Sequence, residues 1–251
     1  MLTWVAFHRN TRALCEPVRL LLHFVGEDFI DKRYQVGPPP SYDKSEWSVE
    51  KEKLGLAIPN LPYYKDANGV VLTQVNAILH YIGEKHGLGG SSPAVRATVI
   101  MLVEGMRDWM NAFFDVTYCN APWLRDQDDV HREGEDQAIS MPGLSQNFDS
   151  ARTAYLENEL PKHLKLYSTI LKDHGPWLLG ESLSHADFVL YEYLDQHRIF
   201  SASCLVPYPA LLDFINVFEA LPKIQEYRSS EHFKAEPLHN RYSQFHRGWV
   251  L

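Results

Sequence analysis

The chain has 251 residues, and 45% of them are hydrophobic, which is enough for a packed core and excludes an intrinsically disordered chain. Its formal net charge of -8 at pH 7 argues against nucleic acid as the partner of the whole chain. The three cysteines have neither the pairing of a disulfide framework nor metal-ligand spacing, so we expect a reducing, cytoplasmic environment and no metal site.

The first 87 residues have the pattern of an α/β domain. A short β-rich run at residues 2–7 follows directly from the N-terminus, so we expect no signal peptide, and no apolar run is long enough to span a membrane. Apolar positions between Leu14 and Val25 recur at helical spacing, and residues 29–34 alternate as in a strand. Asn68 and Gly69 lie between two apolar runs, which predicts a hairpin with a two-residue turn. The order strand, helix, strand, loop, strand, strand, helix predicts a thioredoxin-like domain over residues 1–87.

Residues 94–251 are predicted to form an all-helical domain after a linker at residues 87–93. Helical periodicity begins at Val95 and recurs over residues 155–171, 184–200 and 209–221. Ser184 and Asp187 have the spacing of a capping box, which favours a structural role for this aspartate over a catalytic one. Residues 126–147 are acidic and lack periodicity, so we expect an exposed loop there.

Two segments together indicate a small-molecule clamp made largely of backbone. The Leu61–Pro62 bond is a candidate for cis geometry, which would leave the Leu61 N–H and C=O free to bind a ligand. Gln74 precedes an apolar-periodic helix, whose N-terminus offers unpaired N–H groups and a positive dipole end to a carboxylate. The pair suits a peptide with a free α-carboxylate.

These residues resemble the glutathione transferases, which carry the same Leu–Pro step and a similar helix start after the glutamine. Residues 37–53, 54–56 and 194–200 resemble the mu class, and the likeness covers nearly the whole chain apart from an apparent insertion at about residues 121–150. The resemblance implies a thioredoxin-like domain joined to a helical bundle. It also implies glutathione as co-substrate, conjugation of its thiolate to small hydrophobic electrophiles, and a homodimer.

The resemblance also implies a set of glutathione-binding residues. Lys44, Trp47 and Lys51 would meet the glycine end. Asn60 and Leu61 would hold the central cysteine. Gln74 would take the γ-glutamyl end, and Asp108 would reach its ammonium from the partner subunit. The full set is Leu14, Lys44, Trp47, Lys51, Asn60, Leu61, Pro62, Gln74, Val75 and Asp108.

Two positions in this part of the chain depart from the mu pattern. Val75 replaces a serine that donates to the γ-glutamyl carboxylate, and losing that bond would weaken binding about ten- to a hundredfold. By the same resemblance, Ile58 stands where mu subunits carry an aromatic side chain that locks the dimer, so we expect a smaller aliphatic contact or a different packing there.

Catalysis requires a group that favours the thiolate, because a free cysteine thiol has a pKa of about 8.5. The position of the family's tyrosine is occupied by His8, which could donate to the thiolate or act as a general base. Arg9 follows where the family has tryptophan and would add a fixed positive charge. The alternative is that both are surface residues without a chemical role.

Cys15 and Tyr118 are further candidates. Cys15 would lie at a helix N-terminus and could support thiol–disulfide exchange, or could be a buried packing residue. Tyr118 occupies an electrophile-side position of the mu class, or packs within the helical domain. We expect an acceptor pocket between the domains, walled by His8, Trp109, Phe113 and Tyr118.

Three functions stay open at this point. The first is a glutathione transferase that uses His8. The second is a weakly active or inactive relative that binds ligands. The third is a thiol transferase that depends on Cys15.

Overall fold

The computed structural model describes residues 3–7, 11–12, 14–38, 41–119, 147–235, 237–240 and 243–245. The first half of the chain contains β1 (Thr3–Phe7), α1 (Glu16–Val25), β2 (Phe29–Arg33), α2 (Ser45–Lys51), β3 (Tyr63–Lys65), β4 (Val71–Thr73) and α3 (Val75–Lys85). The strands form one sheet in the order β2-β1-β3-β4, with β2 parallel to β1 and β3 antiparallel to both β1 and β4. The predicted order of elements is confirmed, except that the expected loop after β2 contains α2.

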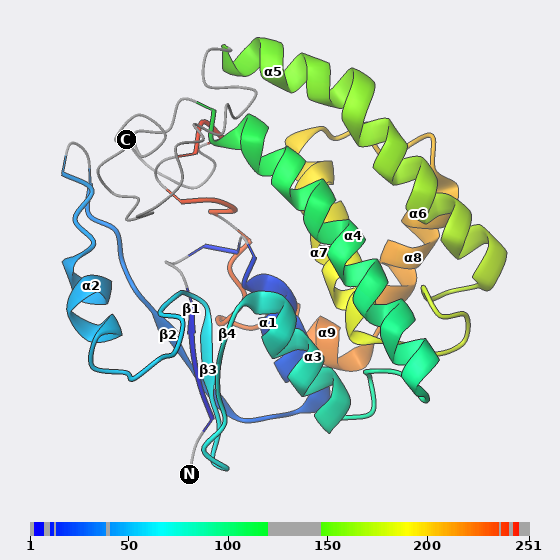
Figure 1. Cartoon of the computed structure of the whole chain (residues 1–251). Helices are drawn as coiled ribbons and strands as arrows, with labels where there is room; N and C mark the ends of the chain where they lie inside the picture. The colour runs from blue at the N-terminus through cyan, green and yellow to red at the C-terminus, as the bar shows by residue number, and fades with distance from the viewer. Residues whose placement is uncertain are drawn as a thin grey trace.

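Helices α1 and α3 lie between the sheet and the helical half of the molecule (Figure 1). Helix α1 begins with a proline in its first turn and ends at Gly26, whose positive φ of 69° suits a residue without a Cβ. Its side chains Val18, Leu21 and Leu22 are buried in the main core. The regularly spaced apolar residues that predicted this helix therefore form the buried face through which α1 joins the sheet to the rest of the chain.

The hairpin between β3 and β4 is present but longer than the two-residue turn that the sequence predicted. Lys65 pairs with Val71, so five residues separate the strands. The Asp66 carboxylate accepts from the N–H groups of Asn68 and Val70 at 2.9 and 3.0 Å, and Gly69 has a φ of 84°. The side chain of Asp66 thus organises the turn, as aspartate commonly does.

The described part of the chain from residue 93 onward is mainly helical, with two isolated β-bridges between residues 177 and 182. It comprises α4 (Pro93–Thr117), α5 (Phe148–Ala154), a π-helical turn η3 (Tyr155–Glu159), α6 (Leu160–His174), α7 (His185–Phe200), α8 (Pro209–Glu219) and α9 (Pro222–Ser229). The mixed sheet followed by helices confirms the expected fold class. The proposed loop and most of the insertion lie outside the described residues, while residues 148–150 begin α5.

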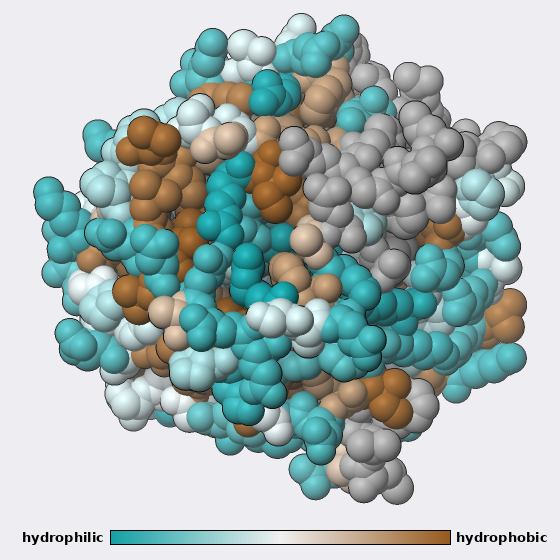
Figure 2. Space-filling view, turned by 180° about the vertical axis from the view of Figure 1, so that it is seen from behind, coloured by the Kyte–Doolittle hydropathy of each residue, from teal (hydrophilic) through white to brown (hydrophobic). Residues whose placement is uncertain are grey.

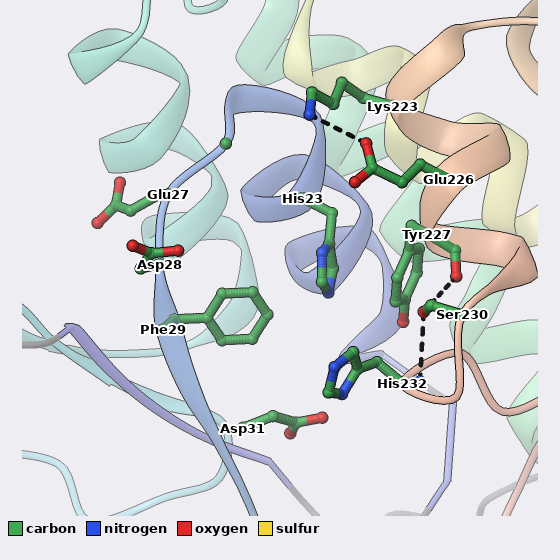
Figure 3. A pocket seen from close by; sticks show the side chains of 11 residues that line it. His23, Glu27, Asp28, Phe29, Asp31, Lys223, Glu226, Tyr227, Ser230 and His232 are labelled. Atoms are coloured by element: carbon green, nitrogen blue, oxygen red, sulfur yellow. Dashed lines mark hydrogen bonds and ion pairs between the residues drawn. The ribbon is translucent and has the colours of Figure 1, made fainter.

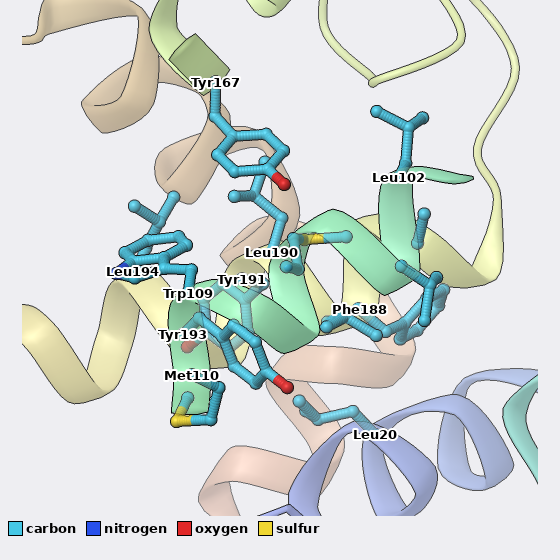
Figure 4. Packing of buried hydrophobic residues seen from close by; sticks show 14 of the residues in the cluster. Leu20, Leu102, Trp109, Met110, Tyr167, Phe188, Leu190, Tyr191, Tyr193 and Leu194 are labelled. Atoms are coloured by element: carbon cyan, nitrogen blue, oxygen red, sulfur yellow. The ribbon is translucent and has the colours of Figure 1, made fainter. Parts of the chain in front are cut away.

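Helix α7 forms the centre of the helical half and is buried along almost its whole length. Figure 4 shows its side chains Phe188, Leu190 and Leu194 packed among residues of neighbouring helices. The predicted capping box is confirmed, because the Asp187 carboxylate accepts from the Ser184 N–H at 2.8 Å and from its hydroxyl at 2.9 Å. Asp187 is therefore a structural residue in the core.

Residues of both halves contribute to one hydrophobic cluster, so the boundary near residues 87–93 stays a prediction. On the rear face, hydrophobic side chains reach the surface in patches among hydrophilic ones (Figure 2). Within the described residues, every helix is too short or too polar to cross a membrane.

Candidate active site

The Leu61–Pro62 peptide bond is cis, as predicted. Tyr63, directly after it, pairs with Ala6 of β1 on one side and with Thr73 of β4 on the other. This register places the cis step at the edge of the sheet where β1 ends and α3 begins. The Leu61 N–H is not free as expected, since the Asn60 Oδ1 accepts from it at 2.9 Å. A ligand that binds this N–H must share it with the Asn60 amide or displace that amide.

Gln74 has an unusual backbone conformation at the same edge. Its φ of 70° and ψ of 116° lie in a region that residues with a Cβ rarely adopt, and its side chain is exposed. The first N–H groups of α3 follow and have no acceptor within the helix. The side chain of Val75 points into the core and is only 4% exposed. Strained backbone of this kind is common at functional sites. No sequence pattern predicted it at Gln74.

Helix α2 is attached beside the cis step through aromatic contacts. The Trp47 ring stacks on Tyr63 at 6.2 Å between centroids and meets Tyr34 edge-on at 5.2 Å. Leu61 belongs to the same small hydrophobic cluster. Lys44 directly precedes α2, and Lys51 is its last residue. The structure therefore brings Trp47, Leu61 and the flanks of α2 together, although they are separated in sequence.

The predicted residues nearer the main core have different surroundings. Leu14 is half-buried against the core, and Cys15 is only 1% exposed within it. Burial of Cys15 fits the packing alternative, because attack on a disulfide needs an accessible sulfur. Asp108 is exposed on α4.

The expected walls of the acceptor pocket need a correction. Trp109 and Phe113 are fully buried inside the helical half, and the Trp109 Nε1 donates to the Tyr155 hydroxyl at 2.9 Å. The periodicity of α4 was recognised, but these two positions face the core. Tyr118 is half-buried at the end of α4 and packs against the C-terminal segment, while its part in the site stays a prediction. Its ring stacks on His239 at 5.4 Å, and its hydroxyl accepts from the Asn240 N–H at 3.3 Å.

The C-terminal segment that holds Tyr118 also contacts the first half of the chain. The Arg12 N–H donates to the Pro237 carbonyl at 3.2 Å, and the Gln244 N–H donates to the Thr117 carbonyl at 2.7 Å. Residues 237–245, as far as described, thus run between the segment before α1 and the end of α4. The described part of this segment, unlike Trp109 and Phe113, lies beside Tyr118.

A buried ion cluster fixes the segment before α1. The Arg12 guanidinium donates to both carboxylate oxygens of Glu192, at 3.1 and 2.5 Å, and also bonds to Asp195. Burial opposes ionisation of Asp195, but Arg12 and neighbouring guanidinium groups outweigh it and hold its pKa below the usual range. Sequence reasoning missed this cluster because Arg12 lies 180 residues from Glu192.

His8 and Arg9 lie outside the described residues, so their part in the site stays a prediction. Within the residues that are described, no group of three or more His, Cys, Asp or Glu side chains is arranged to hold a metal ion. The described part of the site therefore consists of the cis step, the start of α3 and α2.

Comparison with known proteins gives consistent matches. A family model described as "Glutathione S-transferase, N-terminal domain" matches residues 7–84, and one described as "Glutathione S-transferase, C-terminal domain" matches residues 140–231. Glutathione S-transferase Mu 2 of Rattus norvegicus is 37% identical over 91% of this chain and 92% of its own length. Glutathione S-transferase Mu 1 of Oryctolagus cuniculus is 38% identical over the same shares.

Solved structures share the fold. The Pi-class glutathione S-transferase of Onchocerca volvulus aligns with a TM-score of 0.74 at 24% identity, covering 97% of this chain and 100% of its own. The glutathione S-transferase Blo t 8 aligns with a TM-score of 0.77 at 24% identity, covering 96% of this chain and 98% of its own.

Proposed function

Since this chain belongs to the glutathione S-transferase family, with mu-class relatives, we propose that it conjugates glutathione to small hydrophobic electrophiles. The observation that carries the proposal is the cis Leu61–Pro62 step beside the strained Gln74 at the start of α3. In this arrangement the Leu61 backbone binds the central cysteine of glutathione. Gln74 and the N–H groups of α3 bind its γ-glutamyl carboxylate.

The glycine end of glutathione lies against α2 in this proposal. Lys44 and Lys51 supply two positive charges for the carboxylate, and the Trp47 indole supplies an oriented N–H donor. The stack of Trp47 on Tyr63 supports this role, because it ties α2 to the strand that follows the cis step.

The chemical step is nucleophilic attack by the glutathione sulfur. The thiol first loses its proton to solvent or to His8, which stands in the place of the family's tyrosine. The thiolate then forms a carbon–sulfur bond, and the leaving group departs from the electrophile with its electron pair. Arg9 adds a positive charge that favours the thiolate.

We further propose a twofold homodimer in which Asp108 completes the partner's site. Exposed apolar side chains support it, among them Ile100 and Met101 on α4 at 42% and 64% exposure, and Ile58 and Val71 at 62% and 41% exposure. Asp108 is seven residues from Met101 and therefore lies on the same exposed face of α4. A contact over this face would bury the apolar side chains and bring Asp108 close to the other subunit.

Turnover of glutathione with an activated aryl halide tests the proposal. We expect saturable conjugation by the wild-type protein, a loss of at least about tenfold in kcat/KM in His8→Ala, and little change in Cys15→Ala. Saturable glutathione binding without turnover would replace the proposal by the ligand-binding alternative. Loss of activity in Cys15→Ala alone would favour the thiol transferase.

A further inference from the structure

A cavity of about 620 Å³ lies where the end of α1, the start of β2 and α9 meet. It is separate from the candidate active site. Phe29 in its lining pairs with Thr3 at the start of β1, whereas Tyr63 beside the cis step pairs with Ala6 near the end of that strand. The cavity thus opens at the opposite end of the parallel strands, and nothing in the proposed transferase reaction uses it.

Aromatic rings form the inner surface of this cavity. Figure 3 shows His23 between Phe29 and Tyr227, with His232 beyond it. The His23 ring stacks on Tyr227 at 4.0 Å between centroids and meets Phe29 edge-on at 5.1 Å. Flat apolar ligands pack well against such rings, and aromatic faces also attract cations.

The His23 imidazole offers a hydrogen-bond acceptor inside the cavity. Burial lowers its pKa, and the neighbouring His232 adds to this effect, so the ring is neutral near pH 7. Among the described residues, His23 makes ring contacts with Phe29, Tyr227 and His232 but no hydrogen bond through either ring nitrogen. One nitrogen of a neutral imidazole accepts, which suits an N–H donor on a ligand.

The cavity leaves one carboxylate available to a cation. Four carboxylates line the cavity, those of Glu27, Asp28, Asp31 and Glu226. Three of them have a cationic partner: Glu27 is paired with Lys85 at 3.0 Å, Asp31 with Arg19 and Arg33, and Glu226 with Lys223 at 3.0 Å. Asp28 is exposed at the rim, and the described residues supply it with no ion pair. Its carboxylate is therefore available to a positively charged ligand.

We propose that this cavity is a second ligand site, which binds a small aromatic amine in its protonated form. The aromatic body lies against Phe29 and the exposed ring of His232, because His23 already covers Tyr227. The ammonium donates to the His23 imidazole and faces the carboxylate of Asp28. The site does not depend on the transferase proposal, because its residues take no part in binding glutathione.

Calorimetric titration of the full chain with phenethylamine tests the site, with phenylacetate as a probe of similar shape and opposite charge. We expect one phenethylamine per chain, no saturable binding of phenylacetate, and the same phenethylamine affinity in saturating glutathione. Equal binding of the two probes, no binding of phenethylamine, or its displacement by glutathione would overturn the proposal.

Variants locate the site within the cavity. His23→Phe keeps a ring against Tyr227 but removes the acceptor, and it should raise the Kd for phenethylamine about tenfold. Asp28→Asn changes an exposed side chain without disturbing packing and should raise the Kd for phenethylamine about threefold. Asp213→Asn makes the same charge change on the exposed face of α8 and should leave the Kd unchanged. An unchanged Kd in both cavity variants would place the amine elsewhere.

Discussion

Val75 is the first residue of α3, the helix whose start takes the carboxylate in the proposed glutathione site. Its side chain is buried against the core, so the first turn of α3 presents only backbone N–H groups to a carboxylate. A hydroxyl at this position would add a donor without moving the helix. Replacing the valine would also remove the apolar contacts that its side chain makes, which lowers the free energy of unfolding.

Two substitutions at Val75 separate these effects. Val75→Ser and Val75→Ala both lose about the same volume, and both should lower the free energy of unfolding by about 1–2 kcal/mol. Only the serine variant gains a donor, so it should bind glutathione about tenfold more tightly than the alanine variant. Calorimetry compares the two affinities. Equal affinities would mean that the carboxylate does not lie at this helix start.

His239, in the C-terminal segment, makes the stability of the folded protein depend on pH. It is fully buried among Phe113, Phe114 and Tyr118, and burial lowers its pKa to about 3. The unfolded chain binds a proton at this histidine below about pH 6.5, whereas the folded chain does not until about pH 3. Its contribution to stability is therefore lost as the pH falls from about 6.5 to about 3.

His239→Phe removes this proton uptake and keeps an aromatic ring in place. Relative to the wild type, the variant should gain about 1.4 kcal/mol of unfolding free energy for each pH unit below about 6. Urea unfolding at pH 7, 6 and 5 measures this trend. The control His174→Phe, at an exposed histidine, should show no such gain. A pH-independent difference between His239→Phe and wild type would contradict the linkage.

At the scale of the element, long helices were easier to predict from the sequence than short ones. The long helices α4, α6 and α7 were recognised because apolar residues recur over several turns, and the capping box located the start of α7. Helices α2, α5 and α9 have only seven or eight residues, too few for a period to stand out. The hairpin was predicted from Asn68 and Gly69, but not the turn length set by Asp66.

The contact between the segment before α1 and helix α7 rests on the Arg12 guanidinium. Arg12→Met leaves the buried Glu192 carboxylate without its guanidinium partner, while Asp195 keeps Arg198 and Arg228, so unfolding free energy should fall by about 3–5 kcal/mol. Arg96→Met removes a half-exposed arginine 3.9 Å from Glu84 and should cost about 1 kcal/mol or less. Denaturant unfolding compares the variants, and equal losses would mean that the buried cluster adds nothing beyond a surface ion pair.

At the scale of the whole molecule, the backbone part of the site was more predictable than its surroundings. The cis step and the helix after Gln74 follow from local sequence, and the structure places both at one edge of the sheet. The strain at Gln74 and the pairing of Arg12 with Glu192 depend on contacts between distant residues, which no local pattern encodes. The same holds for Trp109 and Phe113, whose face of α4 is decided by the packing of α6 and α7.

The proposed dimer connects α4 to the site of a second chain. Met101→Glu places a charge on the exposed apolar face and should shift the protein toward monomers in sedimentation velocity. Glutathione affinity should fall in parallel, because the partner's Asp108 no longer reaches the glutathione site in a monomer. Leu166→Glu, at a 53% exposed position on α6, is the matched control and should change neither property. A dimer that survives Met101→Glu would place the interface elsewhere.

The measurement that most directly tests the central claim is the thiolate absorbance of glutathione bound to the wild-type protein, followed across pH. If the clamp at Leu61 and Gln74 holds glutathione for conjugation, the bound thiol should ionise well below about 8.5, the ordinary pKa of a cysteine thiol. A bound thiol that ionises like free glutathione, or glutathione that does not bind at all, would contradict the account.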